Sequence, residues 1–312
     1  LRGRNGLIRR GHGDLHLGNI ALIDGRPVPF DAIEFDPVIA SGDVLYDLAF
    51  LLMDLVERGL TAAANVVLNR YLWETRRTED LDALAALPFF MSLRAAIRAK
   101  VTAARRAHAE PAARADIERM ARAYFRLALS FLTPPRPKMI AIGGLSGAGK
   151  SALARALAAD FLPEPGAIIL RSDIERKALF GVGETDPLPA HGYAEEVTSR
   201  VYAVLHEKAA RVIAAGYSVI VDAVFARESE RRLIAEAGRS SGVPFAGLFL
   251  TASLAARIKR VGARVDDASD ADEQVVRRQE AYEIGALDWR IVDAEGKPDE
   301  TLSRARAALA GF

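Results

Sequence analysis

Gly144-Leu145-Ser146-Gly147-Ala148-Gly149-Lys150-Ser151 is the stretch that decides how the second half of this chain folds. It fits the pattern G-x-x-x-x-G-K-[ST] of a phosphate-binding loop. The apolar run 138–143 before it predicts a buried strand, and 152–161 after it predicts a helix. Glycines let backbone N–H groups turn toward phosphate oxygens, and a helix N-terminus adds partial positive charge. Strand, loop and helix together favour a phosphate site over a chance glycine-rich turn.

The chemistry of the loop assigns a role to each residue type. The Lys150 ammonium is expected to reach the β- and γ-phosphates of ATP, and the Ser151 hydroxyl to bind Mg²⁺. ATP and Mg²⁺ are therefore the predicted cofactors. The residues expected to contact the nucleotide are Gly144, Ser146, Gly147, Ala148, Gly149, Lys150 and Ser151.

The composition of the 312 residues is that of a globular protein with room for two domains. The 42 basic and 41 acidic residues leave a net charge of +1, which gives no reason to expect nucleic acid as the main partner. The chain has no cysteine, which excludes disulfides and thiolate chemistry and suits a cytoplasmic protein. No apolar run approaches the roughly 18 residues of a membrane span, so no membrane partner is expected.

Thr133-Pro134-Pro135-Arg136-Pro137 is the clearest linker, because closely spaced prolines cannot continue a helix. We therefore predict a mainly helical domain over 1–132, a linker over 133–137 and an α/β domain over 138–312. In the second domain apolar strand candidates alternate with helical patterns, which predicts a five-stranded parallel sheet with helices on both faces. The predicted strands are 139–143, 167–170, 218–223, 245–250 and 289–292. The predicted helices are 150–161, 173–180, 194–214, 227–238, 254–261, 272–284 and 301–309.

Ligands of such sheets bind beyond the carboxyl ends of the strands. After the second predicted strand, Asp173 is expected to receive the proton of an acceptor hydroxyl, and Arg176 to grip the acceptor or a phosphate. A capping box made by Ser172 and Glu175 is the structural alternative, but it does not explain Asp173 or Arg176. After the third strand, Asp222 is expected to hold Mg²⁺ or orient the nucleophile, with a helix N-cap as the alternative.

The helix after the fourth strand is rich in arginine and leads into a short polar loop over 265–271. Such a segment is typical of a lid whose guanidinium groups close on a transferring phosphoryl group. Arg260 and Arg264 are four residues apart and share a helix face, so they are preferred to Arg257. A solvated face of an amphipathic helix is an equally weighted alternative.

The first 50 residues carry a second pattern. His12 to Asn19 fits H-x-D-x-x-x-x-N, in which Asp14 would accept a hydrogen bond from an acceptor hydroxyl and Asn19 would reach a metal. A hairpin follows and ends at Asp31, where a second metal-binding aspartate is expected. Helical patterns continue from 44 to 132, with a basic run over 94–126 that favours a solvated helix face over an anion-binding groove.

These residues, with Asp43-x-x-x-Asp47-Leu48-Ala49, resemble the C-terminal lobe of aminoglycoside phosphotransferase-like kinases over residues 7–132. The resemblance implies that Asp14 is a catalytic base, that Asn19 and Asp31 bind Mg²⁺, and that Asp47 supports the loop. In that family a nucleotide-gripping lobe precedes the loop, and the residues before His12 cannot build one. We therefore expect a fragment of a longer protein, with this second site incomplete and silent.

The second half is similar to P-loop kinases of the zeta-toxin, chloramphenicol phosphotransferase, gluconate kinase and polynucleotide 5′-kinase grouping. The resemblance covers 138–312 and is carried by G-x-x-x-x-G-K-S, S-D-x-x-R-K, V-I-V-D-A and the arginines before D-A-S-D-A. It implies ATP-dependent phosphotransfer to a hydroxyl, with a small molecule as the leading acceptor. A polynucleotide 5′-hydroxyl acceptor and an ATP-driven switch that regulates the attached lobe are the alternatives. The whole chain resembles bacterial fusions of these two kinase types; its acceptor and oligomeric state stay open.

Overall fold

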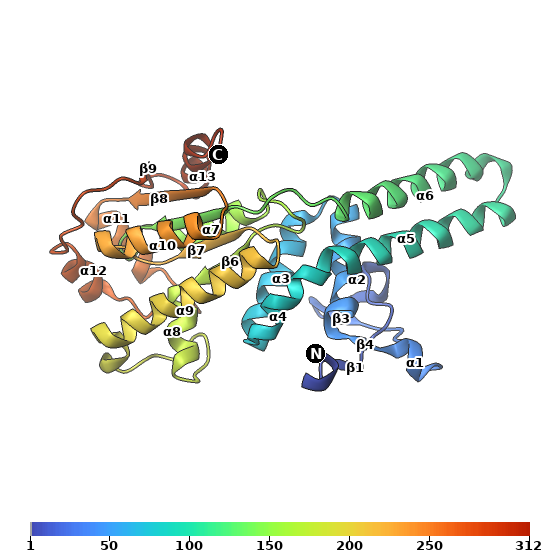
Figure 1. Ribbon diagram of the computed structural model, residues 1–312, viewed down its shortest axis with the longest axis horizontal. Coiled ribbons are helices and arrows are strands. Elements are labelled where there is room, and N and C mark those ends of the chain that lie inside the picture. Colours follow the sequence, from blue (N-terminus) through green and yellow to red (C-terminus); the bar gives the residue numbers. More distant parts are fainter. Residues whose placement is uncertain (1) are drawn as a thin grey trace. The chain divides into compact units, whose positions relative to one another are not determined.

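A computed structural model describes residues 2–312, which form two compact units (Figure 1). The first runs from the start of the described chain to Leu72 and includes Arg77–Pro135 and Pro163–Pro165. The second comprises Trp73–Arg76, Arg136–Leu162 and Gly166–Phe312. None of the described helices has both the length and the apolar character that crossing a membrane requires.

The second unit is built on a parallel five-stranded sheet in the order β6-β7-β5-β8-β9. The predicted sheet is thereby confirmed, and the predicted strand ranges differ from the observed ones only at their ends. In the register, Ile142 of the central strand lies opposite Asp222 of β7, so the end of β7 is placed beside the loop that follows β5. The strands are β5 (Met139–Gly143), β6 (Ile168–Arg171), β7 (Val219–Asp222), β8 (Phe245–Thr251) and β9 (Arg290–Asp293).

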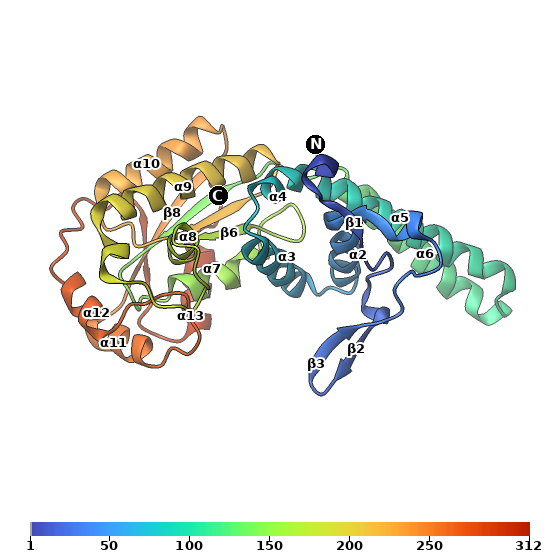
Figure 2. The same ribbon diagram turned by 90° about the horizontal axis from the view of Figure 1, so that it is seen from below.

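Helices cover both faces of this sheet (Figure 2). α7 (Lys150–Ala158) and α13 (Pro298–Ala308) cover one face, and α9 (Glu195–Ala214) and α10 (Glu228–Ser240) cover the other. Because both faces are buried, the strands consist of continuous apolar runs, which is why the sequence revealed them. The shared core includes Ile140, Ile142 and Leu248, each 0% exposed. Fully burying such a side chain contributes about 1.5–3 kcal/mol.

In the second unit, one structural alternative does not form and one predicted helix is shorter than expected. α8 (Ser172–Leu179) has Arg171 as its N-cap and no side-chain cap, so Ser172 and Glu175 form no capping box. Ser172 is already inside the helix, and Glu175 instead accepts a hydrogen bond from Lys208 at 2.6 Å. The predicted helix over 272–284 is the short α12 (Glu273–Gln279). The helix that precedes α12 in the chain is α11 (Leu254–Gly262).

A buried arginine binds the segment that follows α12. Arg231, 1% exposed, donates through Nη2 to the carbonyls of Ile284 at 2.6 Å and Ala286 at 2.8 Å. Its Nη1 donates to the carbonyls of Phe225 at 2.9 Å and Ala226 at 2.8 Å. The carbonyls of Ile284 and Ala286 are therefore satisfied by a side chain instead of by helical amides.

The first unit is mainly helical, as predicted. Two small antiparallel pairs of strands accompany the helices: β1 with β4, and the hairpin β2–β3 (Figure 2). The strands are β1 (Ile8–Arg10), β2 (Ile20–Ile23), β3 (Arg26–Pro29) and β4 (Ser41–Asp43). The helices are α1 (Pro37–Ala40), α2 (Val44–Glu57), α3 (Thr61–Thr75), α4 (Thr78–Ala83), α5 (Leu87–Arg105) and α6 (Pro111–Phe131). Short 3₁₀ turns lie at Arg2–Asn5, Leu17–Asn19, Leu84–Ala86, Arg106–His108 and, in the second unit, Ala190–Tyr193.

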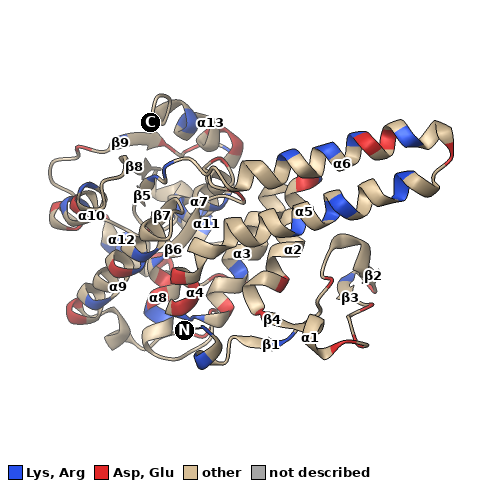
Figure 3. Cartoon of the chain, turned by 45° about the vertical axis from the view of Figure 1, so that its right-hand side comes forward, with Lys and Arg blue, Asp and Glu red and all other residues tan. Residues whose placement is uncertain are grey.

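The basic run of the first unit lies on α5 and α6, which form an antiparallel pair with charges of both signs (Figure 3). On α6, Arg119 pairs with Asp116 at 2.8 Å and Arg122 with Glu118 at 2.7 Å, and all four side chains are exposed. Exposed pairs of this kind contribute about 0–1 kcal/mol. The run is mostly a solvated face, and Arg94, which is buried, departs from it.

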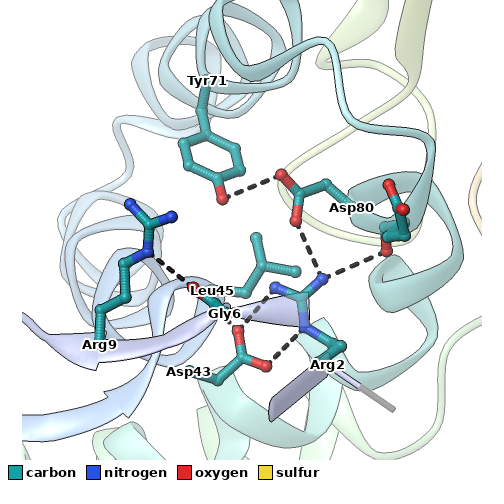
Figure 4. Close-up of polar contacts among 8 residues, drawn as sticks. Arg2, Gly6, Arg9, Asp43, Leu45, Tyr71 and Asp80 are labelled. Atoms are coloured by element: carbon teal, nitrogen blue, oxygen red, sulfur yellow. Dashed lines mark hydrogen bonds and ion pairs between the residues drawn. The ribbon is translucent and has the colours of Figure 1, made fainter. Parts of the chain in front are cut away.

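One polar network ties the start of the first unit to two of its helices (Figure 4). The Arg2 guanidinium donates to both carboxylate oxygens of Asp43, at 2.5 and 2.7 Å, and to Asp80 at 2.9 Å. Asp43 also caps α2 by accepting from the Leu45 N–H at 2.9 Å. Asp80 is 0% exposed and accepts a further hydrogen bond from the Tyr71 hydroxyl at 3.1 Å. Burial and the Asp80 carboxylate raise the pKa of Tyr71.

Replacing Arg2 with methionine is expected to lower the free energy of unfolding of the first unit by about 3–5 kcal/mol, because Asp80 would keep a buried charge without its cation. Chemical denaturation of the full chain measures this loss. The matched control is Arg105→Met at the exposed end of α5, expected to change stability by no more than about 0.5 kcal/mol. Arg2→Met combined with Asp80→Asn should recover part of the loss. A loss no larger than the control's would show that the network does not stabilise the unit.

Candidate active site

The loop between β5 and α7 has the backbone that its glycines allow. Gly147 has φ +83°, and a Cβ there would lie 2.6 Å from the carbonyl oxygen of Arg257. Gly149 has φ +96° and is the N-cap of α7. Only a residue without a side chain fits at Gly147, because a Cβ would meet backbone that cannot move aside. The loop therefore approaches α11 closely while leaving its inner side open.

The inner side of the loop presents unused hydrogen-bond donors. Within residues 2–312, the backbone N–H groups of Gly147, Gly149, Lys150 and Ser151 donate to no other protein group. The same residues line a cavity of about 360 Å³. The first N–H groups of a helix have no intrahelical acceptor and carry partial positive charge. This cavity therefore offers a ready site for an anion at the N-terminus of α7.

Lys150 lies at the start of α7 and lines the same cavity. Its ammonium donates to the carbonyl oxygen of Leu145 at 3.3 Å. Burial lowers the pKa of Lys150, against the attraction of the carboxylates of Asp222 and Asp173. A phosphate in the cavity would add the negative charge that favours the protonated ammonium.

Ser151 and Asp222 meet directly. The Ser151 hydroxyl donates to the Asp222 carboxylate at 2.5 Å, and Asp222 is 3% exposed at the end of β7. Asp222 does not cap a helix, since α10 begins at Glu228. Within the described residues no group of three or more His, Cys, Asp or Glu side chains could form a metal cage. A hydroxyl and one carboxylate beside a phosphate loop nevertheless fit Mg²⁺, which takes most of its remaining ligands from phosphates and water.

Asp173 lies in the first turn of α8 and lines the cavity. Across the described chain its carboxylate makes no hydrogen bond or ion pair, so its oxygens are available to a ligand. Burial raises the pKa of Asp173 in spite of the nearby Arg171, and the charge of Asp222 adds to the increase. A free carboxylate with a raised pKa in a cavity has the properties of a general base.

The contacts of Arg176 differ from those expected for a residue that binds the acceptor or a phosphate. It is buried, donates through Nη1 to the carbonyl of Gly192 at 2.8 Å and lies over the Tyr193 ring at 5.0 Å. It does not line the phosphate-loop cavity. In this arrangement Arg176 holds the segment that precedes α9.

The two preferred lid arginines make different contacts. Arg260 donates through Nη2 to the carbonyls of Ala294 at 2.7 Å and Gly296 at 3.0 Å, so it holds the loop after β9. Arg260 and Arg264 both line the cavity, and Nη1 of Arg264 is buried without a hydrogen-bond partner in the described chain. Arg257, which was not preferred, pairs with Glu280. Both preferred arginines therefore lie at the cavity, and Arg264 has a buried donor left for a ligand.

Two residues of the site were not predicted as functional. Arg171, 2% exposed, ends β6 and lies 3.5 Å from Asp222 and 3.2 Å from Asp267 of the lid loop. Burial lowers the pKa of Arg171, but Asp222, Asp173 and Asp267 outweigh this, and the net change is upward. Its place at a strand end beside Asp173 was the signal that could have revealed it. Gln279 accepts the Ser146 N–H at 2.7 Å, and no local sequence pattern marks it.

The polar loop 265–271, which was predicted to act as a lid, also contacts the segment before α9. Asp270 accepts hydrogen bonds from Lys177 at 2.8 Å, the Leu188 N–H at 3.0 Å and the Tyr193 hydroxyl at 2.5 Å. Lys177 is 1% exposed. These contacts join the lid loop to α8 and to the segment that Arg176 holds.

The residues of the second pattern lie in the first unit. Asn19 donates to the Asp14 carboxylate at 3.1 Å. Asp47 accepts from the N–H groups of His12 at 2.7 Å and Gly13 at 3.0 Å, so it supports this loop. Asp31 is exposed, has φ +61°, and makes no hydrogen bond to Asp14 or Asn19 in the described chain. The structure brings Asp14 and Asn19 together, and Phe30, the residue before Asp31, donates its N–H to the carbonyl of Asn19 at 2.9 Å.

The parallel sheet, the loop after β5 and the cavity beside it define the second unit as a domain of the P-loop type. A family profile described as "AAA domain" matches residues 139–283. Over 310 residues the chain is 30% identical to uncharacterised proteins of Mycobacterium bovis and Mycobacterium tuberculosis. The match covers 97% of this chain and 59% of each relative, so the chain spans little more than half the length of these relatives.

Kinases are among the similar solved structures. A gluconokinase from Sinorhizobium meliloti is 23% identical and covers 56% of this chain and 93% of its own, with a TM-score of 0.41. The Mycobacterium tuberculosis APS kinase, solved with AMPPNP and APS, is 19% identical and covers 57% and 99%, with a TM-score of 0.40.

Proposed function

We propose that the second unit transfers the γ-phosphate of ATP to a hydroxyl group of a small molecule. The observation that carries this proposal is the row of unused N–H groups of Gly147, Gly149, Lys150 and Ser151 around a cavity that also contains Asp173. The first feature is a cradle for phosphate oxygens, and the second is a free carboxylate on the side from which an acceptor could approach. Their combination supports phosphoryl transfer more than nucleotide binding alone.

The residues divide the work as follows. The loop amides and Lys150 hold the β- and γ-phosphates. The acceptor oxygen attacks the γ-phosphorus, its proton passes to Asp173, and the bond from the γ-phosphorus to the bridging oxygen breaks to release ADP. Arg264 donates to the transferring group, where charge develops. Mg²⁺ held by Ser151 and Asp222 would neutralise phosphate charge when bound.

We also propose that residues 1–132 are a part of an aminoglycoside phosphotransferase-like domain, that 133–137 link it to the kinase domain of 138–312, and that the first site is silent in this chain. The contacts among Asp14, Asn19 and Asp47 support the first part of this proposal. The silence of the first site follows from assigning the reaction to the phosphate-loop cavity of the second unit.

An acceptor screen tests the proposed reaction. The full chain with MgATP would be offered pooled sugars, nucleosides and antibiotics, and ADP release would be followed in a coupled assay. We expect at least one pool to raise ADP release and to yield a phosphorylated product by mass spectrometry. ATP hydrolysis that no pool stimulates, or that only another protein stimulates, would favour a regulatory switch. Stimulation only by an oligonucleotide with a free 5′-hydroxyl would favour the polynucleotide kinase alternative.

Asp14→Asn is expected to leave ATP turnover of this chain unchanged within about twofold, because we assign the reaction to the second unit. Steady-state kinetics with the acceptor found in the screen measures this. Asp24→Asn, which changes an exposed aspartate in the turn between β2 and β3, is the matched control. A tenfold or larger loss for Asp14→Asn alone would show that the first unit takes part in the reaction.

A further inference from the structure

The first unit contains a cavity of about 230 Å³ next to the loop that carries Asp14. Its walls come from β1, α1, β4, α2, α3 and α5 and from the loop after β1, and Leu15, Ile39 and Val44 are among the apolar lining residues. The same cavity is lined by two carboxylates, two tyrosines and the guanidinium groups of Arg9 and Arg94. It is therefore a small, largely apolar space with a few charged groups, which is the composition of a ligand site.

The carboxylates that line this cavity already have partners. Asp43 uses both oxygens for Arg2, as Figure 4 shows, and Asp47 accepts the N–H groups of His12 and Gly13. The Tyr71 hydroxyl donates to Asp80 (Figure 4). At the edge of the cavity, Arg9 is exposed and donates to the carbonyl of Gly6 at 2.7 Å. These groups do not require a ligand.

Arg94, in contrast to these groups, has a buried donor without a hydrogen-bond partner in the described chain. It is 8% exposed, and its guanidinium carbon lies 3.9 Å from the centroid of the Tyr46 ring and 4.7 Å from that of Phe50. In residues 2–312 it donates no hydrogen bond, and its Nε is buried without a partner. Stacking on aromatic rings stabilises the charge but leaves the N–H donors in the ring plane unused. Leaving buried donors of a charged group unsatisfied is costly unless a ligand accepts from them.

We propose that Arg94 anchors a small organic anion in this cavity, through a carboxylate or phosphate group. A planar guanidinium in contact with two aromatic rings offers parallel N–H donors, and these match two oxygens of one oxyanion. The apolar part of the ligand lies against Leu15, Ile39 and Val44. The site belongs to the first unit and uses no residue of the phosphate loop. A test of anion binding at Arg94 can therefore fail or succeed independently of the proposed phosphotransfer.

Isothermal titration of the full chain tests this site with four probes: acetate, benzoate, inorganic phosphate and phenyl phosphate, at constant ionic strength. Lys150→Ala is used as the parent chain so that the phosphate loop competes less for phosphate. We expect one saturable site, with benzoate or phenyl phosphate binding more tightly than acetate or inorganic phosphate. Arg94→Lys keeps the charge but lacks the planar donors, so the affinity of the bound probe should fall at least about tenfold.

Arg105→Leu is the matched control, because Arg105 is an exposed arginine of the same helix. It should leave the affinity unchanged within about twofold. Circular dichroism of each variant shows whether the chain is folded. Arg94→Lys is used because lysine keeps the positive charge at this position. Two results would overturn the proposal: none of the four anions binds the parent chain, or binding persists unchanged in Arg94→Lys.

Discussion

Lys150→Ala is expected to lower ATP-dependent turnover of the full chain by at least about a thousandfold, since it removes the one ammonium group positioned for the β- and γ-phosphates. ATP affinity should fall as well, because the loop amides would hold the phosphates without this charge. Titration with a non-hydrolysable ATP analogue and steady-state kinetics measure the two effects. The substitution removes a side chain from the start of α7, where alanine is a good helix former, so the fold should persist.

Lys259→Ala provides the matched control for this experiment. Lys259 is an exposed lysine on α11 and does not line the phosphate-loop cavity. It should retain both turnover and affinity. If Lys150→Ala binds and turns over ATP as well as the control does, the assignment of the phosphate loop is wrong. The proposed phosphotransfer by the second unit is then wrong as well.

Asp173→Asn is expected to reduce kcat by about 10²–10⁴ while KM for ATP changes little, because an amide cannot take the acceptor proton. The pH profile adds a second test. Burial raises the pKa of Asp173, so the basic form becomes populated only at higher pH than for an ordinary aspartate. The wild-type kcat/KM should therefore rise with pH through that raised pKa, and the rise should be absent in Asp173→Asn.

Asp288→Asn is the matched control, since Asp288 is exposed and lies outside the cavity. Both variants remove one carboxylate from the second unit, so general charge effects are shared. A loss of kcat in Asp173→Asn that is no greater than in this control would show that Asp173 is not the general base. Together with ATP hydrolysis that needs no acceptor, it would favour the regulatory switch.

The sheet of the second unit could be predicted because burial on both faces makes each strand a continuous apolar run. The same topology predicted the position of Asp222, because a polar residue that ends an interior parallel strand lies at the edge of the sheet that also carries the loop after β5. The phosphate loop was visible because its glycines and lysine serve one local purpose. Where local chemistry and sheet topology agree, the sequence is informative.

The remaining features depend on contacts between distant segments. Arg231 of α10 binds the carbonyls of Ile284 and Ala286 in the segment after α12, and Gln279 accepts the N–H of Ser146. Arg176 was expected near a ligand from its spacing to Asp173, but its orientation is fixed by Gly192 and Tyr193. In the same way, a spacing of four residues predicted a shared helix face for Arg260 and Arg264. However, α11 ends at Gly262, before Arg264, and the loop after β9 binds Arg260.

Arg231 has a consequence for how the second unit opens. Its four hydrogen bonds join carbonyls at 225 and 226 to carbonyls at 284 and 286. In a chain without cysteine, this side chain is a non-covalent cross-link between the segment after β7 and the segment before β9. If either segment moves away, buried donors lose their acceptors, so the two segments behave as one cooperative unit in local unfolding. Lysine has no planar fork with which to bridge both segments in this way.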